Sequence, residues 1–471
     1  MNKNQIGKGI SNVDKYIETM ALLVGSLHML IPIVKLIYID FVVYLDMVQT
    51  VLICFLLLLV LMKIYTVNRQ NGLSEIKLLI KNFFSRTQLL VSALYGLFLI
   101  SVFVNFYTGE LDSIECVQRY NYDLFVCLFI LFPLSRYYFR NKLPMWIVKT
   151  WKSILVALGI GELIILYSVF SDHVIYIGSG SGIGMLEFND TLQLSINIHP
   201  NIVGQYVGLF FLLSVIIVFV GEKLEKVIFL LLAFINLCIL CLSNSRGSFF
   251  SCLCATAYIC FIGILKRSKE CTKWKLIISI VSVIIVLIGM IVIRDGIFNI
   301  YNNFVLVNNN TGYSNVIREI NITSNNGRTV IWKGSLKLAT SSFKNFMFGI
   351  TPYNISRVLP EIINLNEVSH THNQFLEVLT DIGFPALIIF VIFNIVLAIC
   401  CIKNIISKYD KKNYIVILFI GIIVFLELAN VMEPLLLFYN YLVGAVFIIL
   451  SGFITESRIV NLSEVLQGIS I

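Results

Sequence analysis

The sequence predicts an all-α polytopic membrane protein with one large extracytoplasmic loop that contains short helices. Of the 471 residues, 58% are hydrophobic and only 13% are charged, whereas about a quarter of the residues in a soluble domain are charged. The mean hydropathy is +0.89. Apolar stretches long enough to cross a bilayer as helices recur from one end of the chain to the other. The chain length therefore reflects a series of membrane spans rather than several soluble domains.

We expect about twelve spans. They cover residues 20–39, 47–62, 88–107, 121–135, 153–170, 202–220, 227–242, 248–265, 276–293, 384–402, 414–432 and 435–453. The stretch 121–135 is short, and its helix is expected to begin nearer Tyr120. No small-residue cleavage pattern accompanies the apolar run after Met20, so we interpret it as the first span rather than as a signal peptide.

The distribution of basic residues predicts the orientation. If the N-terminus is cytoplasmic, most of the 35 Lys and Arg residues fall in cytoplasmic segments, as the positive-inside rule requires. Both termini are then cytoplasmic. Topology thus accounts for the net charge of +8, and no nucleic-acid partner is expected.

These spans divide the chain into three parts. Residues 1–293 form a membrane domain of nine spans, residues 294–383 form the large extracytoplasmic loop, and residues 384–471 form the last three spans and a short cytoplasmic tail. A loop of this length usually carries function or is disordered. Its stretches 328–342 and 372–382 have the apolar spacing of helices. The stretch 302–327 is rich in Asn and is predicted to have no regular secondary structure.

One candidate cation lies in the short turn between the spans at 227–242 and 248–265. There, Ser245-Arg246-Gly247 places a guanidinium at the outer interface. A guanidinium binds phosphate oxygens in pairs, and Gly247 lets backbone approach closely. Arg246 could therefore hold a lipid-linked phosphate. The alternative is an interfacial anchor or a contact with a lipid headgroup.

A second candidate cation, Arg328, begins the helical stretch 328–342. Asn326 is a suitable N-cap, and Arg328, Trp332 and Ser335 fall on one face. A cation near a helix N-terminus opposes the helix dipole, whereas an anion bound there gains from both the dipole and the arginine. The alternative is a solvated loop arginine with Trp332 at the interface.

The segment 370–385 supplies a candidate base. His372, Phe375, Leu376 and Leu379 share one helical face. This face should press on the membrane domain and place His372 at the top of the bundle. A neutral imidazole is the usual general base near pH 7, and a polar interfacial histidine is the alternative. We do not expect a metal site, because His370 and His372 would splay apart on a helix and no nearby carboxylate or cysteine completes a zinc pattern.

Another histidine precedes the span at 202–220, in His199-Pro200-Asn201. This segment could line the same site or form a simple turn at the start of the span.

Together and in this order, these motifs resemble the O-antigen ligase and Wzy polymerase superfamily. The matching pieces are His199-Pro200-Asn201, Ser245-Arg246-Gly247, Gly327-Arg328-Thr329-Val330-Ile331-Trp332, His372-Asn373-Gln374-Phe375-Leu376 and Asp381-Ile382-Gly383. The resemblance covers roughly residues 190–400. One departure is Asp381, where the family commonly has Glu.

The resemblance implies a role for each candidate. His372 is the catalytic base, and Arg246 and Arg328 bind the diphosphate of the donor. The residues expected to line the site are His199, Asn201, Ser245, Trp332, His370, Asn373 and Asp381. No metal and no cofactor are implied.

The implied function is that of a polysaccharide repeat-unit polymerase of O-antigen or capsule. It would transfer a growing glycan from undecaprenyl diphosphate to a hydroxyl of the next lipid-linked unit, on the outer face of the bacterial plasma membrane. The alternatives are a ligase that moves finished glycan to lipid A core or protein, and a flippase for lipid-linked oligosaccharide. Expected partners are the lipid-linked oligosaccharide, membrane lipid, a chain-length regulator and a flippase.

Overall fold

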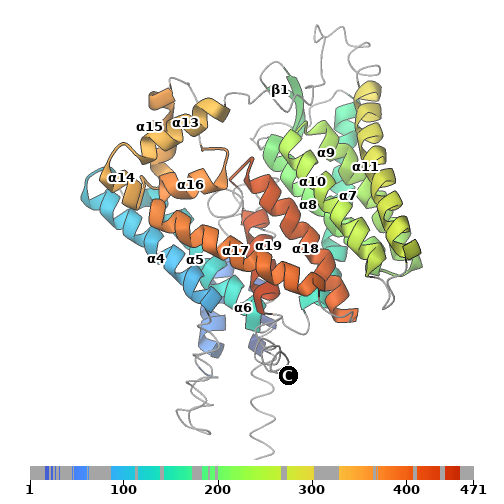
Figure 1. Ribbon diagram of the computed structural model, residues 1–471, viewed down its shortest axis with the longest axis horizontal. Helices are drawn as coiled ribbons and strands as arrows, with labels where there is room; N and C mark the ends of the chain where they lie inside the picture. The colour runs from blue at the N-terminus through green and yellow to red at the C-terminus, as the bar shows by residue number, and fades with distance from the viewer. Residues whose placement is uncertain are drawn as a thin grey trace, which may run out of the picture.

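The computed structural model consists mainly of helices that run side by side in a bundle (Figure 1). The structure describes residues 16–17, 19–20, 23–24, 27, 31, 45, 47–60, 62, 86–111, 115–137, 143–171, 183–188, 191–196, 200–266, 273–301, 328–363, 368, 370–406, 411–434 and 441–456.

Seven helices in this described part are long and apolar enough to cross a membrane. They are α4 (Arg86–Tyr107), α7 (Leu143–Ser171), α8 (Pro200–Val220), α9 (Lys223–Leu242), α10 (Arg246–Leu265), α11 (Lys273–Tyr301) and α17 (Phe384–Ile406). Each coincides with a predicted span, so the membrane-spanning helical fold is confirmed. The count of twelve and the orientation of the termini stay predictions.

Shorter apolar helices lie at four other predicted spans. These are the segment Met47–Val60, a continuous helix made of α5 (Glu115–Phe125), η1 (Val126–Leu131) and α6 (Phe132–Tyr137), and the two helices α18 (Lys411–Asn430) and α19 (Tyr441–Glu456). The helix expected to begin before 121 does begin earlier, at Glu115. The predicted span 20–39 lies almost wholly outside the described residues.

Helix α8 is the most buried of the seven long helices, and α11 is the least buried. Small residues let the helices of the bundle approach one another closely, as is typical where lipid replaces water as the solvent. A Cβ added at Gly208 of α8 would lie 2.8 Å from the ring of Phe425 in α18. One added at Gly421 would lie 2.4 Å from Ile259 in α10.

A β-hairpin departs from the predicted all-α fold. Strand β1 (Ile183–Phe188) pairs antiparallel with β2 (Thr191–Ile196), from Ile183 opposite Ile196 to Phe188 opposite Thr191. The hairpin lies in the Gly/Ser-rich stretch between the spans predicted at 153–170 and 202–220. Strand β2 alternates apolar and polar residues, and one of the apolar residues, Leu194, is fully buried.

In the described part of the region expected to be the large loop, four helices lie at one end of the bundle (Figure 1). They are α13 (Arg328–Ala339), α14 (Phe343–Phe348), α15 (Pro352–Ile363) and α16 (Gln374–Asp381). The two helices predicted from spacing are confirmed as α13 and α16, and the range 302–327 lies outside the described residues. Arg294, expected at the start of the loop, lies instead within α11, which continues to Tyr301.

The C-terminal end of α16 is fixed by close backbone contacts. The carbonyl of Asp381 accepts bonds from Oγ of Ser101 at 2.9 Å and from the amide of Thr351 at 3.0 Å. Gly349, with φ +66°, passes so close that a Cβ there would lie 2.3 Å from the carbonyl carbon of Asp381. Only glycine adopts that conformation readily at such an approach. These contacts hold α16 against α4 and α14.

Candidate functional site

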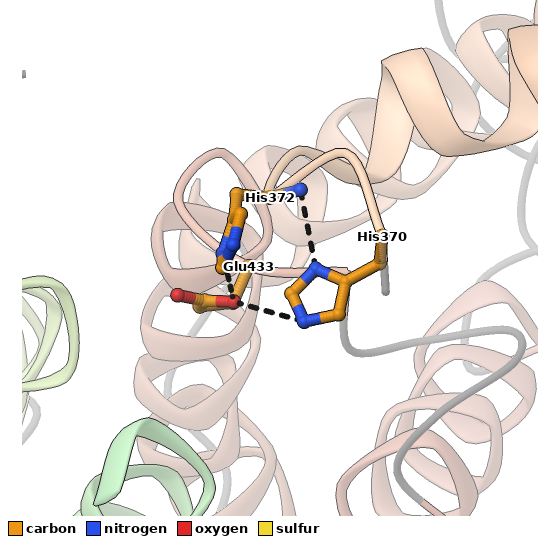
Figure 2. A group of neighbouring side chains, drawn as sticks. All are labelled: His370, His372 and Glu433. Atoms are coloured by element: carbon orange, nitrogen blue, oxygen red, sulfur yellow. Dashed lines mark hydrogen bonds and ion pairs between the residues drawn. The ribbon is translucent and has the colours of Figure 1, made fainter. Parts of the chain in front are cut away.

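Glu433 is the centre of the most highly connected polar cluster among the described residues. Its Oε1 accepts bonds from Nδ2 of Asn201 at 2.6 Å and from Nη2 of Arg328 at 2.9 Å. Its Oε2 lies 2.9 Å from Nδ1 of His372 and 3.9 Å from Nε2 of His370. Figure 2 shows both imidazoles directed at this carboxylate. The cluster therefore joins the start of α8, the start of α13, the segment before α16 and the turn after α18.

The backbone before α16 directs the His372 side chain toward Glu433. His372 has a φ of +55°, a left-handed conformation that non-glycine residues adopt uncommonly and that often marks a functional constraint. Asn373 caps α16, because its Oδ1 accepts bonds from the amides of Phe375 and Leu376 at 2.9 and 3.1 Å. Nδ2 of Asn373 also donates to the carbonyl of Val431 at 3.1 Å. Asn373 thus links the segment that carries His372 to the turn after α18, residues 431–434, which we call the Glu433 turn.

This geometry corrects one prediction. His372 was expected on the same helical face as Phe375 and Leu379, but α16 begins only at Gln374. The predicted contact with the membrane domain does hold for Phe375, whose ring lies 5.4 Å from that of Phe390 in α17. His372 reaches the bundle through its left-handed turn instead.

The Glu433 turn packs against two other predicted motifs. A Cβ added at Gly247 would lie 3.1 Å from Cβ of Met432, and Nη1 of Arg328 lies 3.4 Å from Sδ of Met432. At the start of α8, a Cβ added at Gly204 would lie 2.6 Å from Ser245. The turn that carries Ser245 and Arg246 is therefore adjacent to the cluster.

The cluster keeps Glu433 ionised. Burial opposes ionisation, but the hydrogen bond with His372, the electrostatic interactions with both histidines and the charge of Arg328 outweigh it, and the pKa of Glu433 falls from 4.5 to about 2. A carboxylate that binds one ring nitrogen of a histidine fixes its tautomer and orientation. If Nδ1 of His372 carries the proton shared with Glu433, Nε2 is left as the proton acceptor.

The same residues could hold a metal ion. The ligand atoms of His370, His372 and Glu433 all lie within 4.8 Å of one another, and two histidines with one glutamate form a known zinc ligand set. Both premises of the prediction against a metal fail here. The histidines precede the helix, with ring centroids 4.1 Å apart, and the carboxylate comes from 61 residues further along the chain. Arg328, however, already neutralises this carboxylate.

Three other residues expected to line the site, Asp381, Trp332 and Ser245, have neighbours other than Glu433. Asp381 is fully buried at the far end of α16, where burial and then the nearby Glu377 raise its pKa well above 3.8. Trp332 is half-buried and packs against the small core shared by α13 and α15. Ser245 is buried, and its Oγ bonds to that of Ser248 at 2.9 Å. His199 lies outside the described residues.

Arg246 is half-buried and lines a separate pocket beside the cluster, which it shares with Arg294. The structure thus brings together four of the predicted residues, namely Asn201, Arg328, His370 and His372, around a carboxylate that was not predicted.

Residues 228–391 match the O-antigen ligase family. The match confirms the predicted resemblance, and it indicates glycan transfer of the O-antigen ligase or polymerase type. The matched region contains Arg246, Arg328 and His372, whereas Asn201 and Glu433 lie outside it. No curated protein matches the chain. Of these two residues, Asn201 was predicted from its motif, whereas Glu433 is identified as a member of the cluster by the fold alone.

Proposed function

We propose that this protein is a polysaccharide repeat-unit polymerase of the bacterial plasma membrane, with its site on the extracytoplasmic side. It would transfer a growing O-antigen or capsule glycan from undecaprenyl diphosphate to a hydroxyl of the next lipid-linked unit. The observation that carries the proposal is the convergence of His372, Arg328 and Glu433 at the end of the bundle that bears α13–α16.

The proposed reaction is a displacement at the anomeric carbon of the donor. The acceptor oxygen attacks that carbon while its proton passes to Nε2 of His372. The bond between the carbon and the diphosphate oxygen breaks, and undecaprenyl diphosphate leaves with the bonding electrons. General base catalysis of this kind typically contributes about 10²–10⁴ in rate.

Fixed cations stabilise the charge that develops on the leaving diphosphate. Arg328 uses part of its guanidinium to bind Glu433, which leaves further donors for phosphate oxygens. Arg246 supplies the second guanidinium from the adjacent turn. Because two arginines supply this charge and Arg328 neutralises Glu433, we propose a metal-independent mechanism. Glu433 acts through His372 as a positioning residue.

Replacing His372 with Ala, at matched protein level in cells, tests the proposal. Polymer length on a gel should collapse to single repeat units, and the His370→Ala variant provides a matched comparison. If His372→Ala cells make polymer of normal length, His372 is not the base.

A ligase is the second candidate, because the matching family carries that description. Its site chemistry would be the same, with lipid A core or a protein as acceptor. Loss of polymer attachment with chain length intact would favour the ligase. Lipid-linked units trapped on the inner leaflet after deletion would instead favour a flippase. A chain-length regulator and a separate flippase are expected partners of the polymerase.

A further inference from the structure

A pocket of about 120 Å³ lies between α9, α10 and α11, beside the proposed catalytic cluster. Its walls are mainly apolar and include Leu240, Phe249, Leu253 and Ile291. Two arginines, Arg246 and Arg294, are also among its lining residues. An apolar pocket that carries two cations suits a ligand with an apolar chain and an anionic end.

Arg294 is an unusual residue to find in an apolar helix. It is only 6% exposed, and its guanidinium carbon lies 5.7 Å from the ring centre of Phe249 and 5.2 Å from that of Phe298. Its ion-pair partner among the described residues is Asp295, at 3.4 Å, whose side chain is 59% exposed. A buried charge is costly unless it is well paired. One long ion pair with an exposed carboxylate leaves most of its donors available for an anion.

The pocket borders the lipid-facing surface of the bundle. Two of its lining residues, Phe250 and Ile291, are 56% and 44% exposed. Ile291 belongs to a row of exposed apolar side chains along α11, which forms the edge of the bundle (Figure 1). An amphiphile in the bilayer can therefore reach the pocket sideways without leaving the hydrocarbon.

The Ser245–Arg246 turn separates this pocket from the cluster. Ser245 and Arg246 line the pocket, and the next residue, Gly247, contacts Met432 beside Glu433. A diphosphate held by Arg246 would thus lie between the pocket on one side and the His372 cluster on the other.

We propose that this pocket binds the phosphate-proximal segment of an isoprenoid diphosphate, with Arg294 as a phosphate ligand beside Arg246. The proposal rests on the proposed function, since it locates the lipid part of the donor. The volume is below the roughly 300–1,000 Å³ of pockets that enclose a whole drug-sized ligand. The pocket therefore takes one segment of the chain, and the rest stays in the bilayer.

The test uses the full chain in lipid nanodiscs and measures binding of radiolabelled undecaprenyl diphosphate. Arg294→Gln should weaken binding at least about tenfold, because it removes charge-assisted hydrogen bonds. Arg357→Gln, at an exposed arginine of α15, is the matched control and should leave binding unchanged. Equal affinity for Arg294→Gln and the wild type overturns the proposal.

A second pair of variants tests the apolar part without touching a charge. Ile291→Trp narrows the pocket, whereas Ile285→Trp places the same side chain on the exposed face of α11 outside it. Ile291→Trp alone should weaken binding of undecaprenyl diphosphate. This pair also decides the matter if Arg294→Gln fails to fold. Equal binding by both tryptophan variants overturns the proposal.

Competition distinguishes the occupant. Excess phosphatidylglycerol should not displace the labelled lipid. If it displaces the label as effectively as unlabelled undecaprenyl diphosphate does, the pocket is a general lipid site and the proposal is refuted.

The His372→Ala variant separates the proposed pocket from the proposed function, because it should bind undecaprenyl diphosphate normally and lose transfer. If Arg294→Gln binds undecaprenyl diphosphate normally and His372→Ala loses transfer, only the proposed binding pocket is refuted. If His372→Ala retains transfer, the proposed function is refuted instead.

Discussion

Glu433→Gln should disable the site while it preserves the shape of the side chain. The carboxylate binds Asn201 at 2.6 Å, Arg328 at 2.9 Å and His372 at 2.9 Å. A neutral amide cannot neutralise the charge of Arg328. If its NH₂ group faces Nδ1 of His372, it places a hydrogen-bond donor where the carboxylate had an acceptor. The base then loses its fixed tautomer, and the guanidinium loses its anchor.

The magnitude follows from the pKa of Glu433. Its fall from 4.5 to about 2 corresponds to about 3 kcal/mol of stability at 1.36 kcal/mol per pKa unit. The side chain is only 10% exposed, so solvent screens little of this energy. Because the folded pKa is the lower one, the stabilisation is fully present above pH 4.5 and is lost as the pH falls toward 2. For the reaction, a misoriented histidine costs about 10²–10⁴ in rate.

Two assays measure these effects. Thermal unfolding of the purified protein between pH 3 and 7 should show a stability loss on acidification that Glu433→Gln lacks. Transfer from lipid-linked repeat units should slow by about 10²-fold or more. Glu110→Gln is the control, because it removes an ion pair with Lys344 in the same region through a side chain that is 47% exposed. It should change both readouts little.

The reasoning would be refuted by a Glu433→Gln protein that matches the wild type in transfer rate and in the pH dependence of unfolding. A variant that loses stability but keeps its rate would limit Glu433 to a structural role.

Four further changes have definite expected outcomes. Arg328→Lys keeps the charge but loses the planar fork, so transfer should fall by about 10²-fold; a wild-type rate would remove Arg328 from the diphosphate site. His370→Ala and treatment with a chelator should each leave transfer largely intact, and activity that zinc restores after chelation would establish a metal site instead. Gly349→Ala should sharply lower the yield of folded protein, because its Cβ would lie 2.3 Å from the backbone of Asp381, whereas Gly289→Ala, with nothing within 4 Å, should express normally.

The long helices were predictable because hydrocarbon imposes one rule on the chain. Every backbone polar group must be satisfied within the helix, so each span needs a long apolar run. That requirement is local and visible in the sequence, as α8 and α17 illustrate. The hairpin of β1 and β2 has no such requirement, and its six-residue strands stand out poorly from a Gly/Ser-rich context.

The site was only partly predictable, for reasons of distance and conformation. Arg328 and His372 stood out as chemically distinct residues in a recognisable order. Glu433 did not, because it is a single acidic residue between two apolar runs, 61 positions from His372. A signal did exist, since an ionisable residue at the end of a span and next to a proline is a functional candidate by default. The left-handed turn at His372 could not be predicted from helical spacing.

The contacts of Glu433 link the position of α13 and α16 to the chemistry of the site. Oε1 holds the first residue of α13, while Oε2 holds the histidine that precedes α16. Asn373 adds a bond from the cap of α16 to Val431 in the same turn. If these helices moved away from the turn after α18, His372 would lose its carboxylate and Arg328 its neutralising partner at once. An active base therefore requires that both helices are docked.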